Sequence, residues 1–254
     1  MKKLKLSFKG WTIIIVPVLL SFLLYQKKQV TVYLIGDSTM CLFGPAQSPL
    51  TGWGMPFANF FDSSVTVKDK AESGSSTRTF IEENLWKPVE DSLKPGDYLL
   101  IQFGHNDEVS TKESYTTEKD FKTNLIRFIT AARNKRANPV LITPVARRNF
   151  DDNGNIQETH EPYSTFVRNV ALEYKVPLID LNKKSQHLLQ ELGPEKSKFL
   201  FNHLAPGENP HFPKGAEDNT HFNELGARKI AEMVLAEIKT LKLELADRIV
   251  KPRH

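Results

Sequence analysis

The chain has 254 residues, of which 40% are hydrophobic and 25% charged, a composition typical of a globular protein that can bury one sizeable core. Disordered and fibrous classes are thereby excluded. A single cysteine, Cys41, cannot form an internal disulfide, and one cysteine is too few for a cysteine-rich zinc module. The stability of the fold must therefore come from core packing.

The formal net charge of +4 is concentrated at the N-terminus. Six of the 34 basic residues and none of the 30 acidic residues lie in residues 1–29, so residues 30–254 carry 28 basic and 30 acidic side chains. A near-neutral body lacks the basic surface that binding to a phosphate backbone needs. We therefore expect no nucleic-acid partner.

Residues 1–29 have the pattern of a targeting segment. Four lysines precede an apolar run from Trp11 to Tyr25 that only three residues interrupt. The run is shorter than the ~20 residues of a comfortable membrane span, yet no small-residue cleavage site follows it. A cleaved signal peptide and a retained membrane anchor both remain open. Either predicts that the body lies outside the cytoplasm, secreted, periplasmic or anchored to a membrane only through this segment.

Taken in chain order, residues 30–254 show strands that alternate with helices. Apolar runs bounded by turn signals predict five strands, at Val30–Ile35, Val65–Val67, Tyr98–Phe103, Val140–Val145 and Val176–Leu181. Helical spacing of apolar residues predicts a helix behind Thr117 and another that begins near Asn223. Residues 204–215, rich in proline and glycine, are expected to form a long loop within the domain.

Strands that are apolar throughout and alternate with helices indicate a parallel sheet covered on both faces. We therefore predict one three-layer α/β/α domain over residues 30–254. In such sheets ligands bind at the carboxyl ends of the strands. The polar residues that follow each strand are thus the candidates for chemistry.

Ser38 directly follows the first strand, within Gly36-Asp37-Ser38-Thr39. A serine at such a turn can present its hydroxyl at the edge of the sheet, with its own backbone N–H facing the same space, as a nucleophile requires. Serines after strands are also common helix N-caps. This motif alone leaves the two interpretations equally open.

A serine nucleophile needs a base, and His221 is the best placed of the seven histidines. Asp218 precedes it by three residues, just before the second predicted helix. On one turn this spacing lets the carboxylate reach Nδ1–H and leaves Nε2 free for a serine. A surface ion pair at a helix start is the simpler alternative.

A metal site is the competing interpretation of the same region. His203, His211, Asp218 and His221 are separated by eight, seven and three residues, which matches no compact ligand pattern. We therefore expect no metal. Cys41 has no histidine beside it in the sequence and is expected to be a buried small residue.

Two further residues at strand ends are candidates for stabilising a developing oxyanion. Gly74 follows the second strand and offers a backbone N–H, and Asn106 follows the third and offers an amide donor. With the Ser38 N–H they would supply three donors. A turn glycine and a turn asparagine are the alternatives.

Together these segments resemble, in order, the four blocks of the SGNH or GDSL hydrolase superfamily. The blocks are Gly36-Asp37-Ser38-Thr39, Gly74, Gly104-His105-Asn106-Asp107 and Asp218-Asn219-Thr220-His221. Residues 141–148 and 176–181 are similar to the rhamnogalacturonan acetylesterase branch, and the resemblance covers roughly residues 30–240. It implies a flavodoxin-like fold with a parallel five-stranded sheet and no cofactor.

The resemblance also implies roles for residues. Ser38 would be the nucleophile, His221 the general base and acid, and Asp218 its orienting partner, with Gly74 and Asn106 as oxyanion donors. One departure is Ser75, which stands where that branch usually has an arginine. Arg78, His105 and Arg147 are the candidates for contacting substrate.

The implied activity is that of a carbohydrate esterase that removes O-acetyl groups from an acetylated plant cell-wall polysaccharide, with rhamnogalacturonan as the first candidate. A xylan acetylesterase, and a lipase or thioesterase with the same triad, remain open. An exported carbohydrate-binding protein without turnover is the alternative outside enzymes. The choice between pectin and xylan rests on resemblance alone.

Overall fold

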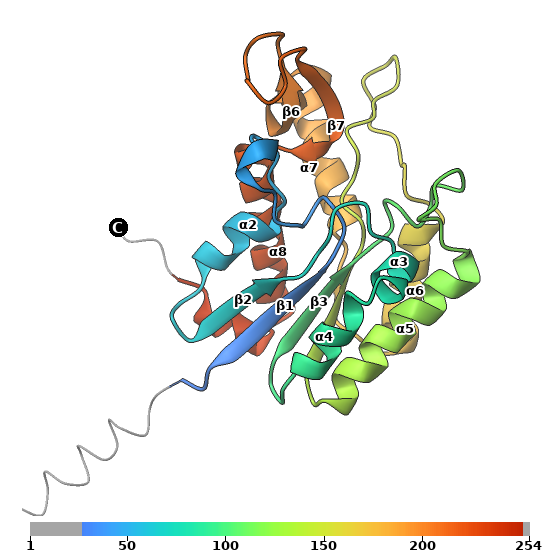
Figure 1. Ribbon diagram of the computed structural model, residues 1–254, viewed down its shortest axis with the longest axis vertical. Helices are drawn as coiled ribbons and strands as arrows, with labels where there is room; N and C mark the ends of the chain where they lie inside the picture. The colour runs from blue at the N-terminus through green and yellow to red at the C-terminus, as the bar shows by residue number, and fades with distance from the viewer. Residues whose placement is uncertain (1–26, 251–254) are drawn as a thin grey trace, which may run out of the picture.

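The computed structural model describes residues 27–250, so the expected targeting segment lies almost wholly outside the described residues. A five-stranded parallel sheet has the order β2-β1-β3-β4-β5 (Figure 1). This order is the flavodoxin-like doubly wound topology, as predicted. The strands are β1 (Val30–Gly36), β2 (Val65–Asp69), β3 (Tyr98–Gln102), β4 (Asn138–Ile142) and β5 (Leu178–Ile179).

Helices cover both faces of the sheet, which confirms the predicted three-layer architecture (Figure 1). One face carries α3 (Thr77–Glu82), α4 (Trp86–Ser92), α5 (Glu118–Asn134) and α6 (Tyr163–Glu173). The other carries α2 (Gly54–Phe57), α7 (Leu181–Lys196) and α8 (Glu224–Thr240). Short 3₁₀ helices lie at η1 (Pro45–Gln47), η2 (Ala58–Phe60), η3 (Ser197–Leu200) and η4 (Glu244–Arg248). Within residues 27–250 no helix has both the length and the apolar character to cross a bilayer.

Two hydrophobic clusters, one on each face, account for the continuous apolar runs of the strands. Val32 and Leu34 of β1 belong to the cluster beneath α8, whereas Tyr33 and Ile35 belong to the cluster beneath α5. Both sets are buried, because successive side chains of a strand point to opposite faces and both faces are covered. Burying one such side chain contributes about 1.5–3 kcal/mol to the stability of the fold. Apolar residues therefore occupy every one of these positions, and the strands can be predicted from the sequence.

The two long helices begin with the caps that the sequence indicates. The Thr117 hydroxyl accepts a hydrogen bond from the Asp120 N–H at 3.2 Å and begins α5. The Asn223 side chain accepts one from the Gly226 N–H at 3.1 Å and begins α8. Each cap satisfies a backbone donor that has no partner within its helix.

The last two strands are shorter than predicted. β4 ends at Ile142 because Pro144, two residues on, has no N–H to continue the ladder. β5 has only two residues because its flanks belong to helices. The Val176 N–H closes α6 on the Ala171 carbonyl at 2.9 Å, and Leu181 already begins α7.

The expected loop at 204–215 is the tip of a β-hairpin. β6 (Phe201–Leu204) and β7 (Ala216–Phe222) pair antiparallel in a small second sheet. In Figure 1 this hairpin stands beyond the ends of the main strands, above α7. The sequence does not predict this hairpin, because β7 (Ala-Glu-Asp-Asn-Thr-His-Phe) lacks the apolar alternation that indicates a half-buried strand.

Candidate active site

The loop after β1 is folded around Asp37. The Asp37 carboxylate accepts hydrogen bonds from the N–H of Thr39 at 2.9 Å and from its hydroxyl at 2.8 Å, and the Asp37 carbonyl accepts one from the Cys41 N–H at 3.1 Å. Asp37, not Ser38, therefore satisfies the local backbone. Ser38 caps no helix, so the N-cap interpretation is wrong.

Gly36 lets this loop lie against the neighbouring strand. A Cβ at Gly36 would stand 2.5 Å from the Gln102 carbonyl oxygen of β3, so only glycine fits there. Gln102 in turn donates to the Thr39 hydroxyl at 2.7 Å and accepts from the Trp53 indole N–H at 2.9 Å. This buried chain of hydrogen bonds fixes the loop that carries Ser38.

The structure brings Ser38, His221 and Asp218 into contact. His221 Nε2 lies 2.9 Å from the Ser38 hydroxyl oxygen, and His221 Nδ1 lies 2.7 Å from Asp218 Oδ2. The other Asp218 oxygen accepts the backbone N–H groups of Thr220 and His221. Burial by itself would raise the pKa of Asp218, but these hydrogen bonds outweigh it and hold that pKa below its usual value.

The Asp218–His221 pair lies on β7, not on a helical turn as its spacing suggested. Near the end of β7 the Asp218 side chain turns toward the residues that follow it and accepts hydrogen bonds from the backbone N–H groups of Thr220 and His221. The contact expected from a turn is therefore made by a strand end.

Asn106 follows β3 and lies in the same cavity. Its side-chain NH2 donates to the buried Ser75 carbonyl at 2.9 Å, and its Oδ1 accepts from Lys112 Nζ at 3.4 Å. A side-chain amide has two N–H donors, so the second one remains for a ligand.

Gly74 also lines this cavity and has a φ of +83°. A Cβ there would meet nothing within 4 Å, so the left-handed backbone, and not lack of space, is what favours glycine.

The cavity that holds these groups has a volume of about 310 Å³. It lies where the carboxyl ends of β1 and β3 meet the end of β7. It is lined by polar residues and one glycine, which are Ser38, Ser73, Gly74, His105, Asn106, Lys112, Arg147, Asp218, Thr220 and His221. All five residues expected to act on an ester are therefore gathered around one small hollow.

The three residues expected to contact substrate have different positions. Arg147 lines the cavity, but its guanidinium already donates to the Thr220 hydroxyl at 2.9 Å and to the His105 carbonyl at 3.1 Å. His105 is only 3% exposed, and burial lowers its pKa to about 4, so the ring is neutral near pH 7. Its Nδ1 faces Asp37 Oδ2 at 3.4 Å.

Arg78 is not among the residues that line the cavity. It donates to the Tyr115 carbonyl at 3.0 Å, and it also contacts Glu82 and the Glu113 carbonyl. Arg78 thus fixes the loop that follows Asn106 instead of replacing the arginine absent at Ser75.

Lys112, which sequence reasoning missed, is the cation that this loop carries to the cavity. It lines both the cavity that holds Ser38 and an adjoining hollow of about 410 Å³. No ion pair joins Lys112 to a carboxylate within residues 27–250. It stands in a polar run after the third strand, where nothing in the sequence distinguishes it from a solvated lysine.

Asp107, next to Asn106, supports the site from within the core. It is fully buried, and its Oδ1 accepts hydrogen bonds from the Thr77 N–H at 2.8 Å and the Thr77 hydroxyl at 2.6 Å. Burial raises the pKa of Asp107 to about 7, because the desolvation of the carboxylate outweighs these hydrogen bonds, which by themselves would lower the pKa. It ties the end of β3 to the start of α3.

The histidines of the hairpin do not converge on a metal-binding arrangement. His203 Nε2 lies 2.9 Å from the Asn219 side-chain oxygen, and His211 is exposed near the hairpin tip. No cluster of three or more metal-ligating side chains occurs in the part of the chain that the structure describes. Burial raises the pKa of the Cys41 thiol to about 12, so this thiol is a poor nucleophile.

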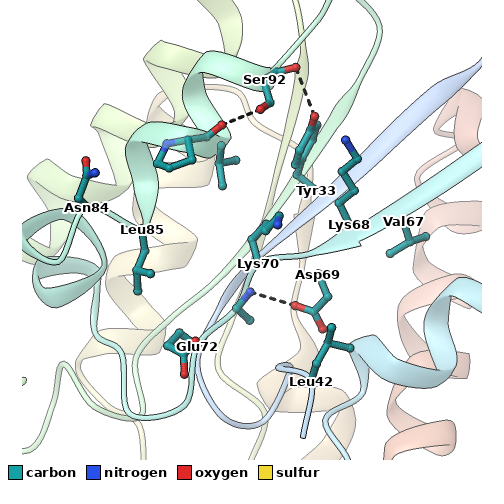
Figure 2. A pocket seen from close by; sticks show the side chains of 13 residues that line it. Tyr33, Leu42, Val67, Lys68, Asp69, Lys70, Glu72, Asn84, Leu85 and Ser92 are labelled. Carbon is teal, nitrogen blue, oxygen red and sulfur yellow. Dashed lines mark hydrogen bonds between the residues drawn. The ribbon is translucent and has the colours of Figure 1, made fainter. Parts of the chain in front are cut away.

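A larger hollow, of about 750 Å³, lies at the β2 edge of the sheet beside α4 (Figure 2). Lys68 of β2 and Lys70, the residue after β2, line it, and Lys68 Nζ lies 5.5 Å from the centre of the Tyr33 ring. The Ser92 hydroxyl at its rim donates to the Pro88 carbonyl at 2.7 Å, and none of the lining residues is a histidine. This hollow offers no base for a serine.

Comparison with known proteins identifies relatives over most of the chain. Residues 34–229 match the model of the GDSL-like Lipase/Acylhydrolase family. The rhamnogalacturonan acetylesterase RhgT of Bacillus subtilis is 43% identical over 226 residues, which are 89% of this chain and 96% of the relative. The probable rhamnogalacturonan acetylesterase YesY of the same organism is 36% identical over 227 residues, 87% of this chain and 98% of the relative.

Solved structures agree with this assignment. The protein YxiM of Bacillus subtilis superposes with a TM-score of 0.73 at 28% identity, over 85% of this chain and 58% of that one. The acetylxylan esterase Axe2 of Geobacillus stearothermophilus superposes with a TM-score of 0.61 at 19% identity, over 89% and 98%, a likeness of fold alone. With the family model covering β1 to α8, the chain belongs to the GDSL-like lipase/acylhydrolase family and is an ester hydrolase.

Proposed function

We propose that the protein removes O-acetyl groups from acetylated rhamnogalacturonan through a Ser38–His221–Asp218 acyl-enzyme mechanism. The observation that carries the chemistry is the continuous hydrogen-bonded line from Ser38 through His221 to Asp218, beside a free Asn106 donor. The 43% identity to a rhamnogalacturonan acetylesterase over nearly its whole length supports the substrate.

In this mechanism the Ser38 hydroxyl attacks the acetyl carbonyl while His221 Nε2 takes its proton. Asp218 holds the ring in the tautomer that makes Nε2 the acceptor and stabilises the imidazolium that forms. Asn106 and the backbone N–H groups of Ser38 and Gly74 stabilise the oxyanion. The intermediate collapses as His221 returns the proton to the departing sugar hydroxyl. Water, deprotonated by His221, then releases acetate and restores Ser38.

The size and polarity of the cavity favour a short acyl group. A volume of about 310 Å³, open to a neighbouring hollow across Gly74, accommodates an acetyl group and part of a sugar. No apolar channel lines it that a long acyl chain could fill. These features argue for an acetylesterase and against a lipase.

Charge near the cavity supports an acidic polymer. Lys112 and Arg147 both line it, and the carboxylates of galacturonate units would be attracted to Lys112 in particular, which has free donors. Such attraction between exposed charges weakens as salt increases. A neutral polymer such as xylan has no group that would profit from it.

The test is release of acetate from acetylated rhamnogalacturonan and acetylated xylan, measured side by side at equal acetyl content. We expect faster release from rhamnogalacturonan, a difference that shrinks as salt is raised, and no release by Ser38→Ala. Equal rates, or faster release from xylan, would remove the pectic assignment and leave the esterase chemistry standing. Persistence of activity in Ser38→Ala would remove the mechanism itself.

We further propose that residues 1–29 direct the protein out of the cytoplasm, on the basis of the lysine-rich start and the apolar run that follows. Fractionation of expressing cells tests this. The full chain should be found outside the cytoplasm, and a chain lacking residues 1–26 should stay inside.

A further inference from the structure

The proposed base is carried by an element that has no hydrogen-bonded place in the main sheet. β7 pairs only with β6, so its position relative to Ser38 depends on other contacts. Two come from the loop after β4. The Arg148 N–H donates to the Asn219 carbonyl at 2.8 Å, and the Arg147 guanidinium donates to the Thr220 hydroxyl at 2.9 Å. Thr220 is the residue immediately before His221.

Arg147 is itself held on its inner side. Its Nη2 donates to the His105 carbonyl at 3.1 Å and to Glu108 Oε1 at 3.2 Å. The Glu108 side chain is only 12% exposed, and it follows β3 in the segment that also carries Asn106. A planar guanidinium with donors on both sides can join these two loops to β7 in a way a single-point cation cannot.

Behind Glu108 lies His160, which is completely buried. His160 Nδ1 lies 2.9 Å and 3.1 Å from the two Glu108 oxygens, and Nε2 lies 2.9 Å from the Val145 carbonyl oxygen. Through its two ring nitrogens His160 therefore bridges the Glu108 carboxylate and the backbone of the loop after β4, in the core beneath the cavity.

The ring of His105 lies between His160 and the loop that carries Ser38. The centres of the His105 and His160 rings are 4.3 Å apart, and the far side of His105 faces Asp37, the neighbour of Ser38. Two carboxylates contact His160: Glu108, with Arg147 beyond it, lies at the ring, and Glu158 Oε1 accepts the His160 backbone N–H at 2.7 Å. Asp37 lies on the other side of His105.

We propose that His160, Glu108 and Arg147 form a positioning relay that fixes His221 relative to Ser38. The hydrogen bonds connect these residues in series: His160 fixes Glu108, Glu108 fixes Arg147, and Arg147 fixes Thr220 and the end of β7. The inference rests on the proposed Ser38–His221 chemistry. It assigns Arg147 to the geometry of the base and not to the binding of substrate.

The relay predicts a loss in kcat and not in substrate affinity. A displacement of about 1 Å between reacting groups lowers a rate by about 10²-fold. Arg147→Met should therefore lower kcat for the small neutral ester 4-nitrophenyl acetate by about 10- to 100-fold and leave KM within about twofold. Arg147→Lys, which can reach one partner but not all three, should recover part of the loss.

A double-mutant cycle tests the connection to His160. If the two residues act through one path, His160→Gln combined with Arg147→Met should be little worse than Arg147→Met alone. Arg127→Met and His187→Gln are matched controls, because both side chains are exposed and distant in the fold, on α5 and α7, and should leave kcat unchanged. If His160→Gln fails to fold, Glu108→Gln takes its place in the cycle.

Two results would overturn the proposal. An unchanged kcat for 4-nitrophenyl acetate, with a raised KM only for the acidic polymer, would make Arg147 a substrate contact. Losses that multiply in the double variant would show that His160 and Arg147 act independently. Neither result removes the proposed function, whose own tests are the comparison of acetate release from the two polymers and the inactivity of Ser38→Ala.

Discussion

Replacing Asn106 with alanine separates the two things that this side chain does. Its NH2 group donates one hydrogen bond to the Ser75 carbonyl, and its second N–H is the proposed donor to the oxyanion in the cavity that Asn106 and Ser38 line. The substitution removes both. Loss of one oxyanion donor lowers kcat by about 10²- to 10³-fold, and KM should change little because the donor acts on charge that exists only in the transition state.

The lost bond to Ser75 adds a stability cost that can be measured separately. Ser75 is 3% exposed, so its carbonyl would remain buried without its partner, at a cost of about 1–3 kcal/mol. For a domain of this size that corresponds to a fall in Tm of roughly 2–12 °C. Asn138→Ala is the matched control, because Asn138 also donates to backbone carbonyls, at Gly96 and Asp97, but at the opposite end of the sheet.

The assay is steady-state hydrolysis of 4-nitrophenyl acetate, with thermal unfolding on the same preparations. Asn138→Ala should lower Tm alone, and Asn106→Ala should lower both Tm and kcat. An Asn106→Ala enzyme with an unchanged kcat and a raised KM would refute the reasoning, because Asn106 would then bind ground-state substrate.

Three further predictions follow from the site. His221→Ala should lower kcat by several orders of magnitude and Asp218→Ala by less, and the double variant should not show the product of the two losses, as kinetics on one ester will reveal. The kcat/KM for 4-nitrophenyl esters should fall from acetyl to butyryl and be negligible at octanoyl; a flat series would contradict the small cavity. Because the folded pKa of Asp107, about 7, exceeds its unfolded value, the stability that protonated Asp107 contributes is complete below about pH 4 and is lost as pH rises through about 7. Denaturant unfolding should therefore show Asp107→Asn gaining on the parent between pH 4.5 and 7.5, and a pH-independent difference would contradict this.

The elements that the sequence predicts are those whose signal lies within a single segment of the chain. The buried runs of β1 and β3 and the capped, periodic helices α5 and α8 each carry their own signal within one segment. Ser38 and the Asp218–His221 pair could be selected because a strand end and a short spacing are also local. The structure then places them in contact across 183 residues of chain, which no local pattern specifies.

The parts that sequence does not predict depend on long-range contacts. β5 is short because neighbouring helices claim its flanks, and the β6–β7 hairpin has charges where a strand pattern needs apolar residues. The sequence suggests Arg78 as a substrate contact because it lies three residues after Ser75, where the related branch usually has an arginine. Its direction is set instead by the carbonyls of a loop more than 30 residues away. His160 follows the polar residues Asp151–Gly154, a composition typical of a solvated loop, and only the fold reveals that its ring contacts Glu108 and the Val145 carbonyl.

The two edge strands of the sheet affect how the protein behaves at high concentration. An unpaired strand edge is a template on which a strand of another molecule can add. β5, at one edge, is only two residues long, and β2, at the other, carries Lys68 at an exposed position and is followed by Lys70 (Figure 2). A charge on an edge strand must be desolvated before a second strand can pair there. These lysines therefore oppose edge-to-edge aggregation. Replacing them with β-branched apolar residues would lower the solubility of the protein before it lowered the stability of the fold.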